Sequence, residues 1–250
     1  MVRKLVARDH QQAYDFWATH FDDPALMANR DAETTRRKLE ALAGQLPWTE
    51  ESEVLDVGPG DGTLFRLISD RVRRCCGVDP SEAAIARLRR SFQGASHVEF
   101  AIGSAEAIPY PDAAFDIVVI NSVLQMLPSL AAIERSLAQL VRVCRPGGLI
   151  FVGELPFRSE LGGGILVHLA RKLREFGARS LLRTLYHVYA RPVLRGEPVV
   201  VYPASNLHVP QPEFEAICRG LGLGVECRPH HEVRRPSSTR NDYLLRRAGG

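Results

Sequence analysis

The sequence predicts an α/β fold, in which a parallel sheet is covered by helices on both faces. Two observations support this prediction. Short apolar runs recur between Val54 and Val152, and stretches with helical spacing of apolar residues separate them. A glycine turn, Gly58-Pro59-Gly60-Asp61-Gly62, joins the first apolar run to the first helical stretch. This is the order of the first half of a nucleotide-binding βαβ unit.

The elements can be placed in order along the chain. Buried strands are predicted where apolar and β-branched residues predominate, at 54–57, 74–78, 97–102, 115–120 and 149–152. Helices are predicted where apolar residues recur every three or four positions, at 63–72, 81–92 and 130–140. Asp61 or Thr63 is placed to cap the first of these helices, and Pro146-Gly147-Gly148 predicts a turn before the fifth strand.

Composition narrows the class of protein. A chain of 250 residues with 45% hydrophobic and 24% charged residues can bury the core of one globular domain. The five cysteines are odd in number and form no Cys-x-x-Cys pair, so we expect reduced thiols in the core. Residues 1–10 do not form a secretory leader, and no apolar run could span a bilayer, so a cytoplasmic protein is expected. The net charge of +3 argues against a nucleic-acid partner.

A carboxylate follows the second predicted strand. Asp79 lies at the distance from the glycine turn at which an acid can accept hydrogen bonds from both hydroxyls of a ribose. An acid at the end of a strand is often only a helix cap. Its combination with the glycine turn favours ribose binding.

Four motifs in order resemble those of the class I S-adenosylmethionine-dependent methyltransferases, in the small-molecule branch that includes the type 11-like domains. The motifs are Glu53-Val54-Leu55-Asp56-Val57-Gly58-Pro59-Gly60-Asp61-Gly62, Gly77-Val78-Asp79-Pro80-Ser81, the stretch from Gly103-Ser104-Ala105-Glu106 to Phe115-Asp116, and Arg145-Pro146-Gly147-Gly148. The resemblance covers residues 53–154. It implies a Rossmann-like, seven-stranded, mostly parallel sheet closed by an antiparallel pair at 222–227 and 243–246. It also implies S-adenosyl-L-methionine as cofactor, bound at the carboxyl ends of the strands.

The resemblance also implies roles for individual residues. Gly58, Gly60 and Gly62 would pass beneath the methionine part of the cofactor, and Asp56 would face its ammonium group. Asp79 would hold the ribose hydroxyls. The remaining residues implied to contact the cofactor are Pro80, Ser104, Ala105 and Glu106 around the adenine, and Asn121 and Gln125 near the transferred methyl. Many relatives carry Asp in place of Ser104, so Glu106 is a candidate replacement.

Two other functions share part of this sequence pattern. A nicotinamide-dependent oxidoreductase would place its third glycine five residues after the first, where this chain has Thr63. The chain also contains no Tyr-x-x-x-Lys pair. A non-catalytic protein that binds the cofactor remains an alternative, although the intact cofactor motifs favour an enzyme.

The domain organisation is predicted as a helical flap at 1–50 and a methyltransferase domain at 51–250, with a helical cap inserted at 156–205. Aromatic residues at 14–21 either pack against the domain or cover the cofactor, and a polar helix is expected at 31–46. The region 156–196 carries eight Arg or Lys residues and two Glu residues, with spacing for two amphipathic helices. Three roles are open for these cations. They are solvated, or they recognise an anionic acceptor, or they contact an acidic membrane surface that bears a lipid-linked acceptor.

The acceptor is expected to be a small molecule, methylated on an oxygen of a natural product, glycan or lipid precursor, with nitrogen and carbon acceptors left open. Residues expected to contact it are Met126, His168, Arg171 and His187. An oxygen acceptor benefits from a general base. We favour His208, because residues 206–210 should re-enter the sheet at its carboxyl edge, and Glu154 is the second candidate. His230 and His231 are expected in an exposed loop, and a homo-oligomer is left open.

Overall fold

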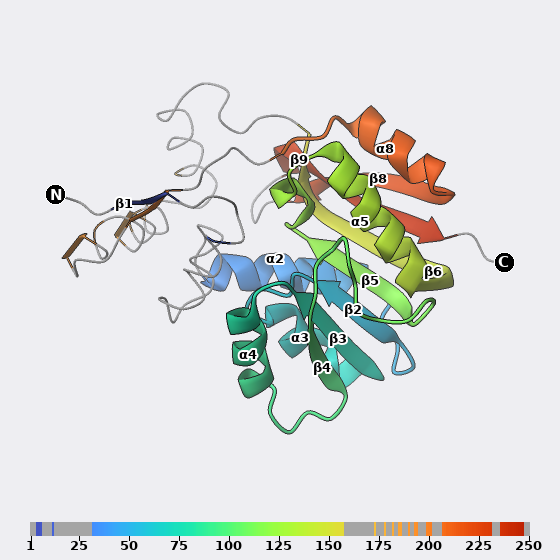
Figure 1. The fold of residues 1–250 in the computed structure, drawn as a ribbon, viewed down its shortest axis with the longest axis horizontal. Helices are drawn as coiled ribbons and strands as arrows, with labels where there is room; N and C mark the ends of the chain where they lie inside the picture. The colour runs from blue at the N-terminus through green and yellow to red at the C-terminus, as the bar shows by residue number, and fades with distance from the viewer. Residues whose placement is uncertain are drawn as a thin grey trace.

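The computed structural model describes residues 4–6, 12, 32–157, 207–231 and 236–247, together with single positions and one short strand between 173 and 201. Most of the predicted flap and cap therefore lies outside the described residues. This includes the aromatic positions 14–21. Figure 1 shows the described core as a sheet with helices packed against it.

The main sheet has seven strands in the order β4-β3-β2-β5-β6-β9-β8. Its strands are β2 (Glu53–Val57), β3 (Arg74–Asp79), β4 (Val98–Ile102), β5 (Phe115–Asn121), β6 (Cys144–Pro156), β8 (Leu223–His231) and β9 (Pro236–Arg247). The first five are parallel, and β9 is antiparallel to both β6 and β8. This confirms the predicted fold class, including the closing antiparallel pair.

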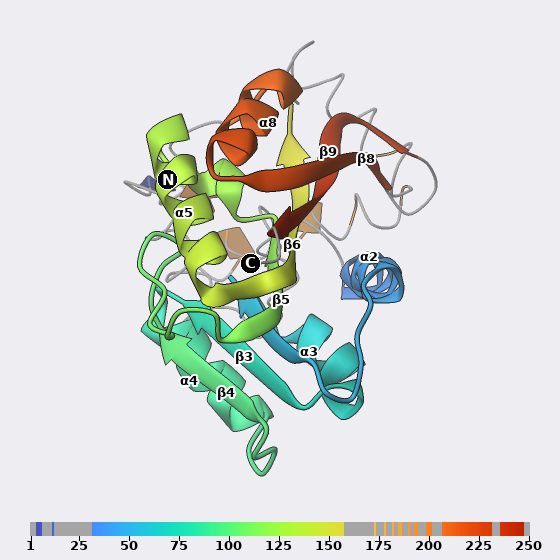
Figure 2. The same ribbon diagram turned by 90° about the vertical axis from the view of Figure 1, so that its right-hand side faces the viewer.

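Helices cover both faces of this sheet. They are α2 (Ala32–Gln45), α3 (Thr63–Ile68), α4 (Glu82–Ser91), α5 (Leu130–Val143) and α8 (Gln211–Gly220), with short 3-10 turns η2 (Ser69–Arg71) and η3 (Leu124–Met126). The predicted helix at 63–72 is thus an α-helix followed by a 3-10 turn. Side chains of α2, α3 and α4 share one core with Val54 and Phe151, whereas α5 and α8 share the other with Leu55 and Val152. Figure 2 shows α5 and α8 on one side of the sheet and α2 and α3 on the other.

Local sequence explains where two of these helices begin. Ser81 precedes α4, and its side chain accepts a hydrogen bond from the Ala84 N–H. Ser129 caps α5 in the same way through the Ala132 N–H. Asp61 accepts hydrogen bonds from both the backbone and the hydroxyl of Thr63, which orders the entry to α3. The bonds to Ser81 and Ser129 satisfy N–H donors that a helix start would leave unpaired. The cap residue of α3 is Gly62, which makes no side-chain cap bond, so Asp61 acts from one position before the cap and Thr63 is not the cap.

The segment predicted as a turn at 146–148 belongs to β6. The pairing register with β5 shifts between the pairs Phe115–Cys144 and Ile117–Leu149, so residues 145–148 bulge from the ladder. Gly147 has a positive φ of 78°, which glycine adopts without the steric cost of a Cβ. The chain therefore does bend at the predicted turn, but the bend lies within β6 and not before it.

A second, two-stranded sheet was not predicted. β1 (Lys4–Val6) pairs in parallel with β7 (Val199–Val201), which brings the start of the chain beside the segment that precedes α8. The β-branched run Val199-Val200-Val201 favours an extended strand. Of the cysteines, Cys75, Cys76, Cys144 and Cys218 are buried as expected, and Cys227 is half-buried. Among the described helices, none is long and apolar enough to cross a membrane.

Candidate functional site

The glycine turn after β2 forms the base of the candidate site. Gly58, Gly60 and Gly62 all have positive φ values, of 77°, 59° and 77°. A Cβ on Gly58 would lie 2.5 Å from Val123 Cγ2, and one on Gly62 would lie 2.8 Å from both Leu88 and Phe92. A Cβ on Gly60 would meet nothing within 4 Å. The turn thus packs tightly at its two ends, while its middle faces open space in which a ligand can approach the backbone.

Asp56 is a buried acid immediately before this turn. Its residue is only 5% exposed, and no hydrogen bond or ion pair joins its carboxylate to any described residue. Burial, together with the nearby charges of Asp79 and Asp61, raises the pKa of Asp56 to about 7. A buried carboxylate of this kind is stabilised by a cation brought by a ligand. The ammonium group of S-adenosylmethionine therefore fits this position.

Asp79 ends β3, the neighbouring strand. Its Oδ1 accepts a hydrogen bond of 2.8 Å from the Ser81 N–H, and its side chain is half-buried. Pro80 is exposed beside it. Across the strand pair, Asp79 is opposite Ile102, whose apolar side chain is 48% exposed. Ile102 was not among the residues expected at the site, and only its position at the end of the predicted third strand could have indicated it.

Ser104 to Ala107 form a tight loop after β4. The Ser104 and Ala107 backbones exchange hydrogen bonds of 3.3 and 3.0 Å, and Ala105 is buried between them. The Glu106 carboxylate accepts a 2.7 Å hydrogen bond from Arg135 Nε on α5. Glu106 is the residue expected to replace the Asp that many relatives carry at the position of Ser104, and its carboxylate takes part in this ion pair.

The end of β5 carries the polar residues expected near the transferred methyl. Asn121 lies over Gly153 of β6, where a Cβ would overlap Asn121 Oδ1. Ser122 adopts a left-handed φ of 62°, and its N–H donates to the Gly153 carbonyl at 3.0 Å. Gln125 is buried and donates to the Ser122 hydroxyl at 2.8 Å, and Met126 is half-buried in the same turn.

His208 lies in the loop that returns to the carboxyl edge of the sheet. Leu207 N–H donates to the Gln125 carbonyl at 2.8 Å, and Val209 N–H donates to the Pro156 carbonyl at 2.7 Å. These two bonds place the His208 backbone between η3 and the end of β6. The residue itself is exposed.

Glu154 is buried at the same edge, but its carboxylate already has cationic neighbours. Lys38 Nζ and Arg240 Nη1 lie 3.5 and 3.2 Å from its Oε2. His230 lies in the same group, so the expectation of an exposed loop was wrong for it: the residue is 7% exposed and hydrogen-bonded to Asp242. The error arose because strand pairing with β9 brings Asp242 to this histidine from another part of the chain.

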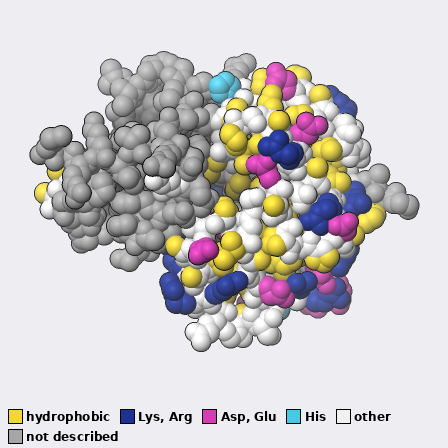
Figure 3. Space-filling view, in the orientation of Figure 1, with side chains coloured by type: hydrophobic (Ala, Val, Ile, Leu, Met, Phe, Trp, Pro, Cys, Tyr) yellow, Lys and Arg dark blue, Asp and Glu magenta, His cyan; other side chains and the backbone are white. Residues whose placement is uncertain are grey.

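Three residues expected to contact the acceptor, His168, Arg171 and His187, lie outside the described residues. Asp56, Asp79 and Asn121 lie at or near the carboxyl ends of β2, β3 and β5, which are on one edge of the sheet because these strands are parallel. On the face seen in Figure 3, acidic and basic side chains are interspersed over the described core.

The chain is similar in sequence to known methyltransferases. Residues 55–152 match the family model described as "Methyltransferase domain". A malonyl-[acyl-carrier protein] O-methyltransferase of Pectobacterium atrosepticum is 32% identical over 184 residues, which are 70% of this chain and 68% of that protein. A 27-O-demethylrifamycin SV methyltransferase of Amycolatopsis mediterranei is 32% identical over 149 residues, which are 58% of this chain and 53% of that protein.

Among solved structures, phosphoethanolamine N-methyltransferase 1 of Haemonchus contortus, in complex with phosphoethanolamine and S-adenosylhomocysteine, has a TM-score of 0.69 and 13% identity. The match covers 96% of this chain and 48% of that one, and at this identity it supports the fold alone. The chain spans about half the length of the first curated relatives it matches. Fold, motifs and relatives agree that the chain belongs to the class I S-adenosylmethionine-dependent methyltransferases.

Proposed function

We propose that the protein transfers a methyl group from S-adenosylmethionine to an oxygen atom of a small-molecule acceptor. The observation that carries this proposal is the buried carboxylate of Asp56, which pairs with no described residue, beside a glycine turn with open space over Gly60. The Asp56 carboxylate calls for a cation, and the open space over Gly60 allows a ligand to contact the backbone closely. The amino-acid end of S-adenosylmethionine meets both requirements.

In this proposal the remaining cofactor contacts follow the strand ends. Asp79 accepts hydrogen bonds from the ribose hydroxyls, each worth roughly 1.5 to 3 kcal/mol because the acceptor is charged. Pro80, Ile102 and Ala105 offer apolar surface to the adenine. Ser104 replaces the usual acid at the adenine amino group. Since Arg135 holds Glu106, we assign that acid to the ion pair and not to the adenine.

When bound, the cofactor supplies an activated methyl group on a sulfonium. The chain's own contribution is to hold the acceptor in line with that methyl, and good alignment is worth about 7 to 11 kcal/mol in model reactions. Asn121, Gln125 and Met126 are proposed to line this position. Gln125 Oε1 is a buried atom without a hydrogen-bond partner among the described residues, so it is available to a ligand donor.

An oxygen acceptor also has to lose a proton. We propose His208 as the general base, because its loop is hydrogen-bonded to both η3 and the end of β6, and its side chain is exposed. Glu154 is less suited to this role, since Lys38 and Arg240 already stabilise its charge. A general base contributes roughly a hundred- to ten-thousandfold to the rate.

For the acceptor, we propose a natural-product, glycan or lipid precursor that carries an anionic group. The two curated relatives reported above are named as a malonyl-[acyl-carrier protein] O-methyltransferase and a 27-O-demethylrifamycin SV methyltransferase. The predicted cap at 156–205 is rich in arginine. Among its described residues, the large apolar side chains at 173, 182, 185, 186, 193 and 194 are exposed. This composition suits an anionic acceptor, either free or presented at a membrane surface by a cytoplasmic enzyme.

The test is methyl transfer from cofactor labelled with ¹³C in its methyl group. Purified protein would be incubated with panels of carboxylic, phenolic and sugar acceptors, and the products analysed by mass spectrometry and NMR. We expect a gain of one methylene and a carbon shift typical of an O-methyl group. An N-methyl or C-methyl shift would replace the oxygen assignment, and binding of the cofactor without any product would favour a non-catalytic protein.

A further inference from the structure

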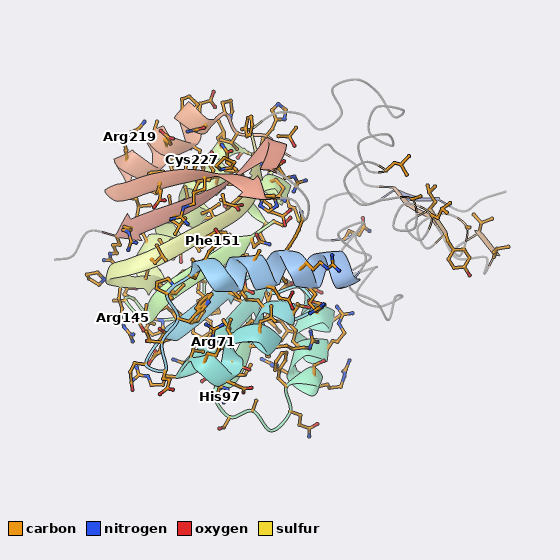
Figure 4. The ribbon with its side chains drawn as sticks, turned by 180° about the vertical axis from the view of Figure 1, so that it is seen from behind. Arg71, His97, Arg145, Phe151, Arg219 and Cys227 are labelled. Atoms are coloured by element: carbon orange, nitrogen blue, oxygen red, sulfur yellow. The ribbon has the colours of Figure 1, made fainter. Side chains whose placement is uncertain are left out.

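A buried group of ionisable side chains joins α2 to the carboxyl end of β6. It consists of Lys38, Glu154, His230, Arg240 and Asp242, which are 7%, 1%, 7%, 8% and 7% exposed. We call these residues the Glu154 cluster. They come from four elements: α2, β6 and the neighbouring strands β8 and β9. Figure 4 shows α2 lying across the back of the sheet, close to Phe151 of β6, and both belong to the same apolar core.

The hydrogen bonds within the cluster indicate which ring nitrogen of His230 donates and which accepts. His230 Nδ1 lies 2.9 Å from Asp242 Oδ1, so this nitrogen carries the proton that is shared with the carboxylate. Its Nε2 lies 3.3 Å from Lys38 Nζ and accepts a hydrogen bond from the ammonium, which can only donate. The cluster thus contains two cations, Lys38 and Arg240, and two carboxylates, Glu154 and Asp242. Buried charges are tolerated in such a paired arrangement.

Glu154 reaches this cluster through an irregularity in its strand. Its φ is 58°, and the register between β6 and β9 shifts between Val152 and Leu155. Val152 and Leu155 both pack in the core that contains α5 and α8, which regular alternation would not allow for residues three apart. The bulge turns the intervening Glu154 side chain toward α2. A left-handed backbone at a residue other than glycine persists only where surrounding contacts impose it.

The same irregularity forms the surface beneath Asn121. Gly153 directly precedes Glu154, and its carbonyl accepts the Ser122 N–H at 3.0 Å. Asn121 covers Gly153, and Ser122 is itself left-handed at 62°. A change in the Glu154 backbone therefore moves Gly153 and, with it, the end of β5.

We propose that Lys38 is a positioning residue for methyl transfer. From α2 it holds the Glu154 side chain on the face of the sheet that regular alternation would not give it. In this way it keeps Gly153 and Asn121 in the geometry that binding of the acceptor requires. Lys38 contacts neither cofactor nor acceptor in this account and acts through Glu154. The inference rests on the proposed function only in assigning the β5 end to the acceptor.

The test compares Lys38→Met with Lys38→Arg and with a control on the same helix. Lys38→Met should lower kcat at least tenfold while the Kd of S-adenosylhomocysteine changes less than threefold. Lys38→Arg should recover most of the turnover, because it restores a cation near Glu154. Arg36→Met removes an exposed cation of α2 that pairs with Glu40, and should retain wild-type turnover.

A second readout does not depend on finding an acceptor. With S-adenosylhomocysteine bound, hydrogen–deuterium exchange of amides 119–127 should be faster in Lys38→Met, and in Glu154→Gln, than in wild type or Arg36→Met. Unchanged exchange together with unchanged turnover would overturn the proposal, as would a lower Tm alone. If Lys38→Met fails to fold, Glu154→Gln and Lys38→Arg decide the matter by the same readouts. If wild-type protein methylates nothing, the proposed function fails while the exchange data still decide the role of Lys38.

Discussion

Asn121 at the end of β5 lies directly over Gly153 of β6, so closely that any side chain at position 153 would overlap its amide oxygen. The Ser122 N–H ties the same two strands together through the Gly153 carbonyl. This contact fixes the edge of the sheet at which the cofactor and acceptor are proposed to meet. Replacing Gly153 with alanine adds one methyl group at this contact and so tests its importance.

Gly153→Ala should therefore displace Asn121 and destabilise the fold by about 1 to 3 kcal/mol, the usual range for overpacking. Methyl transfer should fall more than tenfold. The matched control is Gly44→Ala in α2, where a Cβ would meet nothing within 4 Å. That variant should gain roughly 0.5 to 1 kcal/mol, because alanine favours a helix over glycine. Chemical denaturation measures both, and equal effects at the two positions would contradict the packing account.

Gly60→Ala tests the open middle of the glycine turn. The new methyl group would clash with no described residue, so the variant should fold with a cost of about 1 to 2 kcal/mol for its positive φ. In the proposed site the methyl group enters the space of the cofactor, and the Kd of S-adenosylhomocysteine should rise at least tenfold. Gly94→Ala carries the same kind of strain at a φ of 94° in another loop with open space around it. An unaltered Kd in Gly60→Ala, or an equal loss in Gly94→Ala, would argue against binding at the turn.

Asp56→Asn should make the cofactor-free protein more stable above neutral pH. The pKa of Asp56 is raised to about 7 in the folded state from 3.8, chiefly by burial, so the folded state holds a proton that the unfolded state releases between these values. The stability that this proton contributes is lost as the pH rises through 7. The difference in the free energy of unfolding between the Asn variant and wild type should grow from pH 4 to pH 7. It should reach roughly 1 to 4 kcal/mol and stay constant above pH 7. Urea denaturation at pH 5, 6, 7 and 8 tests this, and an advantage independent of pH would refute the assignment.

His208→Ala should lower kcat by roughly a hundred- to ten-thousandfold with an oxygen acceptor. The Kd of the cofactor should stay within threefold, because the residue is exposed on a loop held by its neighbours' backbone bonds. His208→Gln keeps the size and polarity of the side chain without its basicity and should lose the same activity. Full turnover in either variant would remove His208 from the mechanism.

Most of the fold follows from local sequence. Runs such as Val118-Val119-Ile120 and Leu149–Val152 are buried on both faces of the sheet, and a continuous apolar run is the typical pattern of such strands. The glycine turn and Asp79 were also placed correctly at the ends of β2 and β3, because strand ends and turn residues are adjacent in the chain.

The features missed depend on contacts between distant segments. The helix at 31–46 was expected to be polar, yet Lys38 is buried in it through partners on β6 and β8. His230 was expected in an exposed loop because arginines flank its stretch, but β9 covers it. The left-handed Glu154 likewise results from a register shift between strands, which no local pattern of residues specifies.

Calorimetric titration of the purified chain with S-adenosylhomocysteine is the most direct test of the account. We predict saturable binding at one site, with an affinity up to about tenfold higher at pH 8 than at pH 6 as Asp56 loses its proton. The account would be contradicted if neither S-adenosylhomocysteine nor S-adenosylmethionine produced heat while a nicotinamide dinucleotide bound.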